Sequence, residues 1–267
     1  MIDRYFFAEP GLSFLIEEER KQILFDVGYS DVFIKNAYKM NIRFWGLDYL
    51  VLSHGHLDHT WGLPDLIKLF TEAKIESIDC QMPTLVAHPL IFTPKEIGEL
   101  KEIGSMVSVE EARKHFLVKL SSDPVWLTEK LVFLGEIKRE NDFEAKHPIG
   151  KIEKGEIKED DFILDDSALA YCSKNGLIII TGCSHAGICN IIEQAKEVCK
   201  DNRVIDVIGG FHLQNPNKKQ IEGTVNYFKN LKPKVLHACH CTDLKSKIAL
   251  SQIADLQEVG TGLVLHY

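Results

Sequence analysis

The sequence predicts a mixed α/β fold of four layers, an αββα sandwich in which two sheets pack face to face and helices cover the outside. Segments with strand-like and helix-like hydrophobic periodicity alternate in two blocks, and each block begins with strands. The 267 residues are 45% hydrophobic, enough to bury a large core, and no Pro/Gly/Ser-rich linker divides them. We therefore expect a single domain over residues 1–267.

The first block begins with an antiparallel pair of strands. In SFLIEEERKQILFDVG (13–28), two apolar runs are joined at Glu18 to Arg20, and the second ends at Asp26. The elements expected after this pair are a helix at 31–40, a strand at 47–52, a helix at 63–73, a strand at 85–88 and a helix at 94–104. The last helix is predicted from Thr93 as N-cap and Pro94 at its first position.

The second block again begins with strands, within residues 118–137. The charged segment 138–161 predicts an exposed loop or hairpin of the kind that often borders an active site. An Asn-Gly turn at Asn175 then predicts a hairpin of strands at 168–172 and 177–181. The remaining elements expected are helices at 186–200, 218–230 and 244–253, which alternate with strands at 204–208, 235–238 and 263–266.

Composition argues against several classes of partner. The net charge is −8 and the basic residues are scattered, so nucleic acid is not expected as a partner. No apolar run approaches the roughly 18 residues of a membrane span, and the first residues lack the pattern of an export signal. Seven cysteines without a C-x-x-C pair predict reduced thiols. We expect a cytoplasmic protein with a small-molecule substrate and no membrane partner; its oligomeric state is not predicted.

The strongest functional signal is the segment LVLSHGHLDH (50–59), which places four metal-binding side chains directly after an apolar strand. His54 and His56 project to the same side if the backbone is extended, whereas Asp58 and His59 follow a turn and can face a second ion. Imidazole and carboxylate ligands suit Zn²⁺, Mn²⁺ or Fe²⁺. The segment therefore predicts one or two divalent metal ions and gives no basis for choosing among these metals; zinc is the first expectation, with manganese or iron as alternatives. A polar loop that merely caps the next helix is the weaker alternative.

The pattern H-x-H-x-D-H after a strand resembles the signature of the metallo-β-lactamase superfamily, and LFDVG (24–28) resembles the aspartate-bearing turn that precedes it there. The motifs VLSHGHLDHTWGL, TGCSHAG, IGGFHL and CHCTD together resemble one branch of its metal-dependent hydrolases. That branch includes the dihydropterin ribofuranosyl-aminobenzene phosphate synthases. The resemblance covers most of the chain and implies the metallo-β-lactamase type of αββα sandwich.

The resemblance also implies roles for individual residues. Many members of the superfamily carry an aspartate that bridges two metals where this chain has Cys183. This difference leaves open whether one metal or two are bound, and whether Cys183 is a ligand or a small buried filler. The implied roles are His54 and His56 for the first metal, Asp58 and His59 for the second, Asp26 as a supporting aspartate, His185 as a further metal-proximal residue and His240 as the residue that closes the second site.

Three further features lie at predicted strand ends. His212 follows Gly209 and Gly210, which would let a ligand approach the backbone, so it is a candidate for metal or substrate contact; the alternative is a histidine that ends a core strand. The helix predicted from about residue 186 would offer free N–H groups to an anionic substrate group. Cys239 and Cys241 are expected to pack in the core.

These features predict a metal-dependent hydrolase that uses metal-activated water on a small, anionic substrate such as a phosphoester, lactone or thioester. A bound metal lowers the pKa of its water to about 7, and Asp58 would orient that water or accept its proton. The first alternative is a transferase that condenses a dihydropterin with a ribofuranosyl-aminobenzene phosphate. The second is a non-catalytic metal sensor or scaffold, which the replacement of the bridging aspartate suggests.

Overall fold

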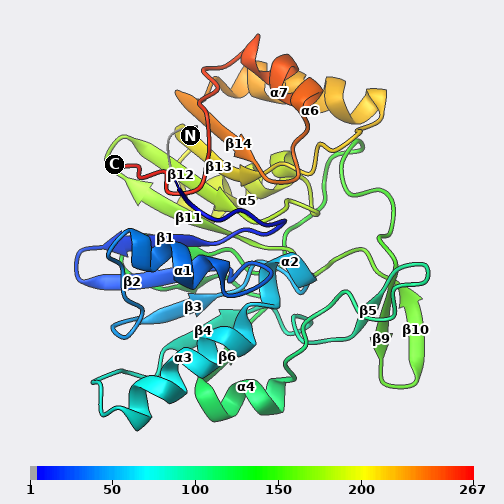
Figure 1. Cartoon of the computed structure of the whole chain (residues 1–267). Helices are drawn as coiled ribbons and strands as arrows, with labels where there is room; N and C mark the ends of the chain where they lie inside the picture. The colour runs from blue at the N-terminus through cyan, green and yellow to red at the C-terminus, as the bar shows by residue number, and fades with distance from the viewer. Residues whose placement is uncertain (1–4) are drawn as a thin grey trace. The chain divides into compact units, whose positions relative to one another are not determined.

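The structure, a computed structural model, describes residues 5–267, which fall into two compact units (Figure 1). Within the described residues, the N-terminal unit contains residues 5–122 and Ile149–Asp161, and the C-terminal unit contains Asp123–Pro148 and Phe162–Tyr267. Each unit has its own sheet and helices. The prediction of a single domain stays a prediction. No helix within residues 5–267 is long and apolar enough to cross a membrane.

The N-terminal unit is built on a five-stranded sheet of order β1-β2-β3-β4-β6. β1 and β2 pair antiparallel as predicted, and the other neighbours are parallel. The strands are β1 (Phe14–Glu18), β2 (Lys21–Phe25), β3 (Tyr49–Val51), β4 (Thr84–Ala87) and β6 (Leu117–Leu120). Because parallel strands end at one edge of the sheet, the residues that follow β2 and β3 lie close together.

Helices cover one face of this sheet. Leu50 and Leu85 from the strands join Phe33 and Leu66 from the helices in one buried cluster. The helices of the unit are α1 (Val32–Lys39), α2 (Leu57–Thr60), α3 (Leu63–Ile75) and α4 (Val109–His115). Helix α4 was not predicted, although Ser108 caps it by accepting a hydrogen bond from the Glu111 N–H (3.2 Å), an S-x-x-E pattern.

The predicted helix at 94–104 is wrong. Lys95–Glu96 instead forms β5, which pairs with β9 (Lys151–Lys154), and β9 forms a hairpin with β10 (Ile157–Asp160). The Lys95 ammonium is fully buried and lies 2.9 Å from the Asp161 carboxylate. This long-range ion pair and the strand pairing outweigh the local capping signal. The hairpin confirms part of the prediction for 138–161, whereas residues 138–148 belong to the C-terminal unit.

The C-terminal unit contains a six-stranded sheet of order β14-β13-β12-β11-β8-β7, in which β12, β13 and β14 are parallel. Buried residues of α5, α6 and α7, among them Ile191, Phe228 and Leu250, cover one face of it. The elements are β7 (Val125–Trp126), β8 (Leu131–Phe133), β11 (Ala168–Ser173), β12 (Gly176–Thr181), α5 (Ile188–Cys199), β13 (Val204–Gly210), α6 (Lys218–Leu231), β14 (Val235–Cys239) and α7 (Leu244–Ser251).

The predicted hairpin around Asn175 is confirmed as β11 and β12. The predicted strand at 263–266 is wrong, since these residues are irregular and pair with no strand within the described chain. The end of the chain is held instead by a side chain, because the Tyr267 hydroxyl donates to the Asp206 carboxylate. Each unit thus contains a main sheet with helices on one face, and the N-terminal unit also contains the small sheet β10-β9-β5.

Candidate metal centre

The four metal-capable residues of the N-terminal unit converge on the short segment after β3. His54 and His56 precede α2, and Asp58 and His59 lie on it. The His54 Nε2 and His56 Nδ1 atoms are 3.1 Å apart, and the His59 Nε2 atom is 3.7 Å from Asp58 Oδ2. Ring nitrogens and a carboxylate gathered this closely form the kind of donor set that divalent transition metals prefer.

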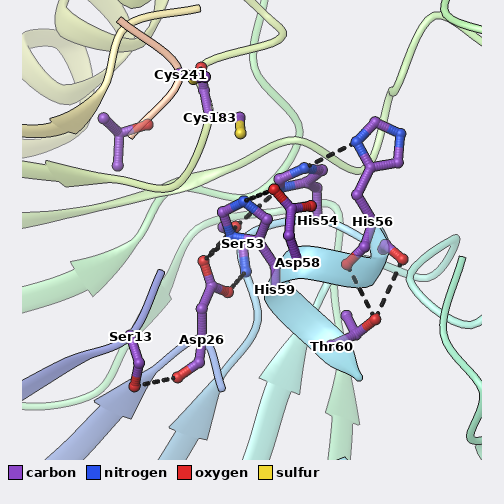
Figure 2. A network of polar contacts seen from close by, with 12 residues as sticks. Ser13, Asp26, Ser53, His54, His56, Asp58, His59, Thr60, Cys183 and Cys241 are labelled. Atoms are coloured by element: carbon purple, nitrogen blue, oxygen red, sulfur yellow. Dashed lines mark hydrogen bonds and ion pairs between the residues drawn. The ribbon is translucent and has the colours of Figure 1, made fainter. Parts of the chain in front are cut away.

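Asp26 fixes the orientation of two of these histidines (Figure 2). Its Oδ1 atom accepts the Ser53 N–H (2.7 Å), and its Oδ2 atom accepts both the Ser53 hydroxyl (2.7 Å) and His59 Nδ1–H (2.7 Å). Because the single hydroxyl proton of Ser53 is used by Asp26, His54 Nδ1–H must donate to Ser53 Oγ (3.0 Å). Both rings therefore carry the proton on Nδ1 and keep the lone pair on Nε2 free for a metal ion.

The segment 94–104 braces α2 at both ends. The Leu57 N–H donates to the Ile103 carbonyl (2.8 Å), and the Trp61 indole N–H donates to the Gly104 carbonyl (2.6 Å). Within the turn, the Thr60 hydroxyl donates to the His56 carbonyl (3.0 Å; Figure 2). The backbone that carries Asp58 and His59 is thus held by contacts on each side of these two candidate ligands.

In the C-terminal unit, the predicted site residues follow the ends of three adjacent parallel strands. Cys183 and His185 follow β12, His212 follows β13 and His240 follows β14. The Cys183 Sγ atom and a ring nitrogen of His240 lie within 4.8 Å of each other. The rings of His185 and His212 are in contact, with centroids 4.3 Å apart. Parallel topology therefore brings together residues that are up to 57 positions apart in the sequence.

Gly209 and Gly210 are needed because neighbouring atoms leave no room for a side chain at either position. A Cβ atom on Gly209 would lie 2.0 Å from the Thr181 carbonyl oxygen, and one on Gly210 would lie 2.6 Å from the Cys241 Sγ atom. A side chain at Gly209 would overlap the end of β12, and one at Gly210 would overlap the loop after β14, so close packing requires both glycines. The approach of a ligand to their backbone stays a prediction.

Cys241 lies against Cys183, a neighbour that sequence analysis did not predict for it. Its thiol donates to the Cys183 carbonyl oxygen (3.3 Å; both residues are labelled in Figure 2). A hydrogen bond with the Cys183 side chain, together with His212 and the nearby His240, holds the pKa of Cys241 well below its usual value, although burial opposes this. Cys239 behaves as predicted for a core thiol, because burial raises its pKa to about 12. The prediction for Cys241 assumed an extended backbone. His240 instead has a left-handed backbone (φ 49°), which changes the direction of the next side chain.

The N-terminus of α5 is occupied by the protein's own carboxylates. The Cys189 and Asn190 N–H groups donate to Glu144 at 3.1 and 3.2 Å, and the Ala186 N–H donates to Asp166 at 2.8 Å. Burial raises the pKa of Glu144, and it raises the pKa of Asp166 to about 7. The prediction that a substrate anion rests at this helix end is therefore wrong, because Glu144 from the loop 138–148 and Asp166 already accept these N–H groups.

Comparison with known proteins identifies the family. Residues 7–79 match the model of the metallo-β-lactamase superfamily. A protein of Methanocaldococcus jannaschii named 7,8-dihydropterin-6-methyl-4-(β-D-ribofuranosyl)-aminobenzene-5'-phosphate synthase is 35% identical over 91% of this chain and 84% of its own length. This chain belongs to the metallo-β-lactamase superfamily, in the branch that includes that synthase. A second protein of the same organism, uncharacterized protein MJ0448, is 30% identical over 93% of this chain and 90% of its own length.

Solved structures confirm the predicted α/β fold class. The crystal structure of Tm1679, described as a metal-dependent hydrolase of the beta-lactamase superfamily, is 27% identical with a TM-score of 0.83. It covers 99% of this chain and 94% of its own length. The metallo-β-lactamase fold protein YhfI of Bacillus subtilis, 11% identical with a TM-score of 0.58 over 97% of this chain and 94% of its own length, shares the fold.

The prediction of a hydrolase is contradicted. The relative with 35% identity over 84% of its length is a synthase, and this matches the transferase alternative. The error has a physical reason. The segment from His54 to His59 specifies a metal, but a bound metal can assist several kinds of reaction, so the ligands alone do not select the substrate.

Proposed function

We propose that this protein is a metal-dependent synthase that condenses a 7,8-dihydropterin with a ribofuranosyl-aminobenzene phosphate. The observation that carries the proposal is the 35% identity to the synthase of M. jannaschii over most of both chains. In such a condensation the amine nitrogen forms a bond to the 6-methyl carbon of the pterin. The leaving group on that carbon departs with the electron pair of the broken bond, and the nitrogen loses one proton.

The donor residues fit one or two divalent ions, and a thiolate beside imidazole and carboxylate ligands favours zinc. Following the resemblance to the superfamily, we assign His54 and His56 to one ion and Asp58 and His59 to the other. Within the C-terminal unit, Cys183, His185, His212 and His240 are candidate contacts to metal or substrate. The fixed tautomers of His54 and His59 support this assignment. When bound, the metal supplies a Lewis acid that stabilises negative charge as it develops on the reacting groups.

The protein's own contribution to proton transfer is assigned to Asp58. Its side chain is 23% exposed, whereas His59 beside it is fully buried. A carboxylate that is held in place yet accessible to solvent can accept the proton that the amine nitrogen loses. Asp26 is fully buried and already accepts three hydrogen bonds, which suits a positioning role instead.

The proposal is tested by incubating zinc-loaded protein with ribofuranosyl-aminobenzene phosphate and a 7,8-dihydropterin activated at its 6-methyl carbon. Mass spectrometry should detect the condensed product, and chelation or His56→Ala should abolish it. His266→Ala, which changes an exposed histidine outside the segment 138–161, is the matched control. Stoichiometric metal without condensed product would contradict the proposal and favour a non-catalytic metal protein.

A further inference from the structure

Beside the metal-binding segment, two aromatic side chains of the N-terminal unit stack on each other. The rings of Tyr29 and Trp61 have centroids 5.3 Å apart and are inclined by 29°. Trp61 is the second residue after His59, and Tyr29 follows the turn that begins at Asp26. Tyr29 is 40% exposed, although stacking has already covered part of it. The pair therefore presents aromatic surface to solvent beside the metal ligands.

The pair is held in place at both residues. The Trp61 indole N–H donates to the Gly104 carbonyl (2.6 Å), and the Tyr29 N–H donates to the Glu9 carboxylate (2.9 Å). The Gly62 N–H also donates to the Gly28 carbonyl (3.3 Å), which ties the two segments together. A surface held this way loses little conformational entropy when a flat ligand stacks on it.

Backbone contacts place the pair close to Asp58. A Cβ atom added to Gly11 would lie 2.9 Å from the Tyr29 nitrogen and 3.1 Å from the Asp58 carbonyl oxygen. The backbones of Tyr29 and Asp58 thus flank the same small residue. The neighbouring Leu12 N–H donates to the Asp58 carbonyl as well (3.2 Å).

We infer that the stacked pair of Tyr29 and Trp61 binds the ring of the dihydropterin, an inference that rests on the proposed function. A flat, conjugated bicyclic ring gains stacking contact with an aromatic face. The other substrate also carries an aromatic ring, but it bears a phosphate. The Glu9 carboxylate beside Tyr29 repels that phosphate and leaves an uncharged pterin ring unaffected. We therefore place the uncharged, bicyclic pterin ring on this surface.

The test measures KM for each substrate in zinc-loaded wild type, Tyr29→Leu and Tyr29→Phe. Leu keeps the bulk of the side chain without the aromatic face, and Phe keeps the face. We expect Leu to raise KM for the dihydropterin about tenfold, more than it lowers kcat, and Phe to restore it. KM for the aminobenzene substrate should change less than about twofold. Trp126→Leu, an exposed aromatic residue of the other unit, is the control.

Quenching of tryptophan fluorescence by 6-methyl-7,8-dihydropterin separates this inference from the proposed function. If wild type forms no condensed product but the quenching saturates and Tyr29→Leu weakens binding about tenfold, the result supports pterin binding by Tyr29 and Trp61 and contradicts the proposed function. If condensation proceeds and Tyr29→Leu leaves both KM values unchanged, or raises only that of the aminobenzene substrate, the inference that Tyr29 and Trp61 bind the pterin ring is wrong. Absence of saturable quenching in wild type would also overturn it.

Discussion

The two units supply metal-capable residues in opposite ways. In the N-terminal unit, four of them lie within six consecutive residues and are braced by local hydrogen bonds and by Asp26. In the C-terminal unit, Cys183, His212 and His240 are far apart in sequence, and the ends of three parallel strands bring them together. The first set is fixed by local chain geometry, whereas the second depends on the tertiary fold. We therefore expect substitutions in the two sets to differ in what they disturb.

The largest effect is expected for His56→Ala, in the set of four residues between His54 and His59. A structural zinc site binds its ion with about 10–16 kcal/mol of free energy shared among its ligands, so loss of one should weaken metal binding on the order of 1,000-fold. The fold should survive, because the segment is held by backbone contacts. Competition with a chelator measures the affinity and circular dichroism checks the fold. Unchanged metal affinity would remove His56 from the site.

Cys183→Ser tests the set of the C-terminal unit, whose residues are far apart in sequence. It decides whether Cys183 is a metal ligand or a small buried core residue. We expect metal affinity to fall about 100-fold, since serine is a poor zinc ligand at neutral pH. Cys239→Ser is the matched control, because Cys239 is a buried thiol at a strand end whose raised pKa fits a core residue. Equal metal affinity in the two variants would make Cys183 a filler.

Asp166→Asn tests how the fold holds the set of the C-terminal unit, since Asp166 accepts the N–H of Ala186, the residue after His185. Burial raises the pKa of Asp166 from 3.8 to about 7, so ionisation opposes folding. Stability is therefore lost as pH rises from about 4 through 7. Between pH 5 and 7.5, metal-free wild type should lose about 2.5 kcal/mol of unfolding free energy relative to the variant.

Urea unfolding of both proteins at the two pH values measures this difference. If the unfolding free energy changes equally with pH in wild type and Asp166→Asn, ionisation of Asp166 does not destabilise the folded protein and the prediction is wrong.

The smallest effect is expected for Asp26→Asn, which keeps the shape of the side chain that orients His54 and His59. An amide has one acceptor oxygen and cannot accept all three hydrogen bonds, so metal affinity should fall about thirtyfold, within the range typical of such supporting groups. Isothermal titration with zinc provides the measurement. A loss as large as that of His56→Ala would indicate that Asp26 is itself a ligand.

The same contrast explains what could be predicted from the sequence. His54 to His59 and the strand before them were predictable because the signal is local. The hairpin at Asn175 was predictable for the same reason, since an Asn-Gly turn acts at short range. Lys95 and Glu144 were not predictable, because each is buried by a partner distant in sequence: Asp161 for Lys95, and the N-terminus of α5 for Glu144. Cys241 was missed because one left-handed residue, His240, redirects the chain.

The central claim is that the segment from His54 to His59 binds a metal ion. It is tested most directly by the zinc affinity of His54→Ala, His56→Ala and the double variant. If both histidines bind one ion, the double variant should lose much less affinity than the product of the two single losses, because the first substitution has already dismantled the site. Single losses that multiply fully in the double variant would contradict the claim.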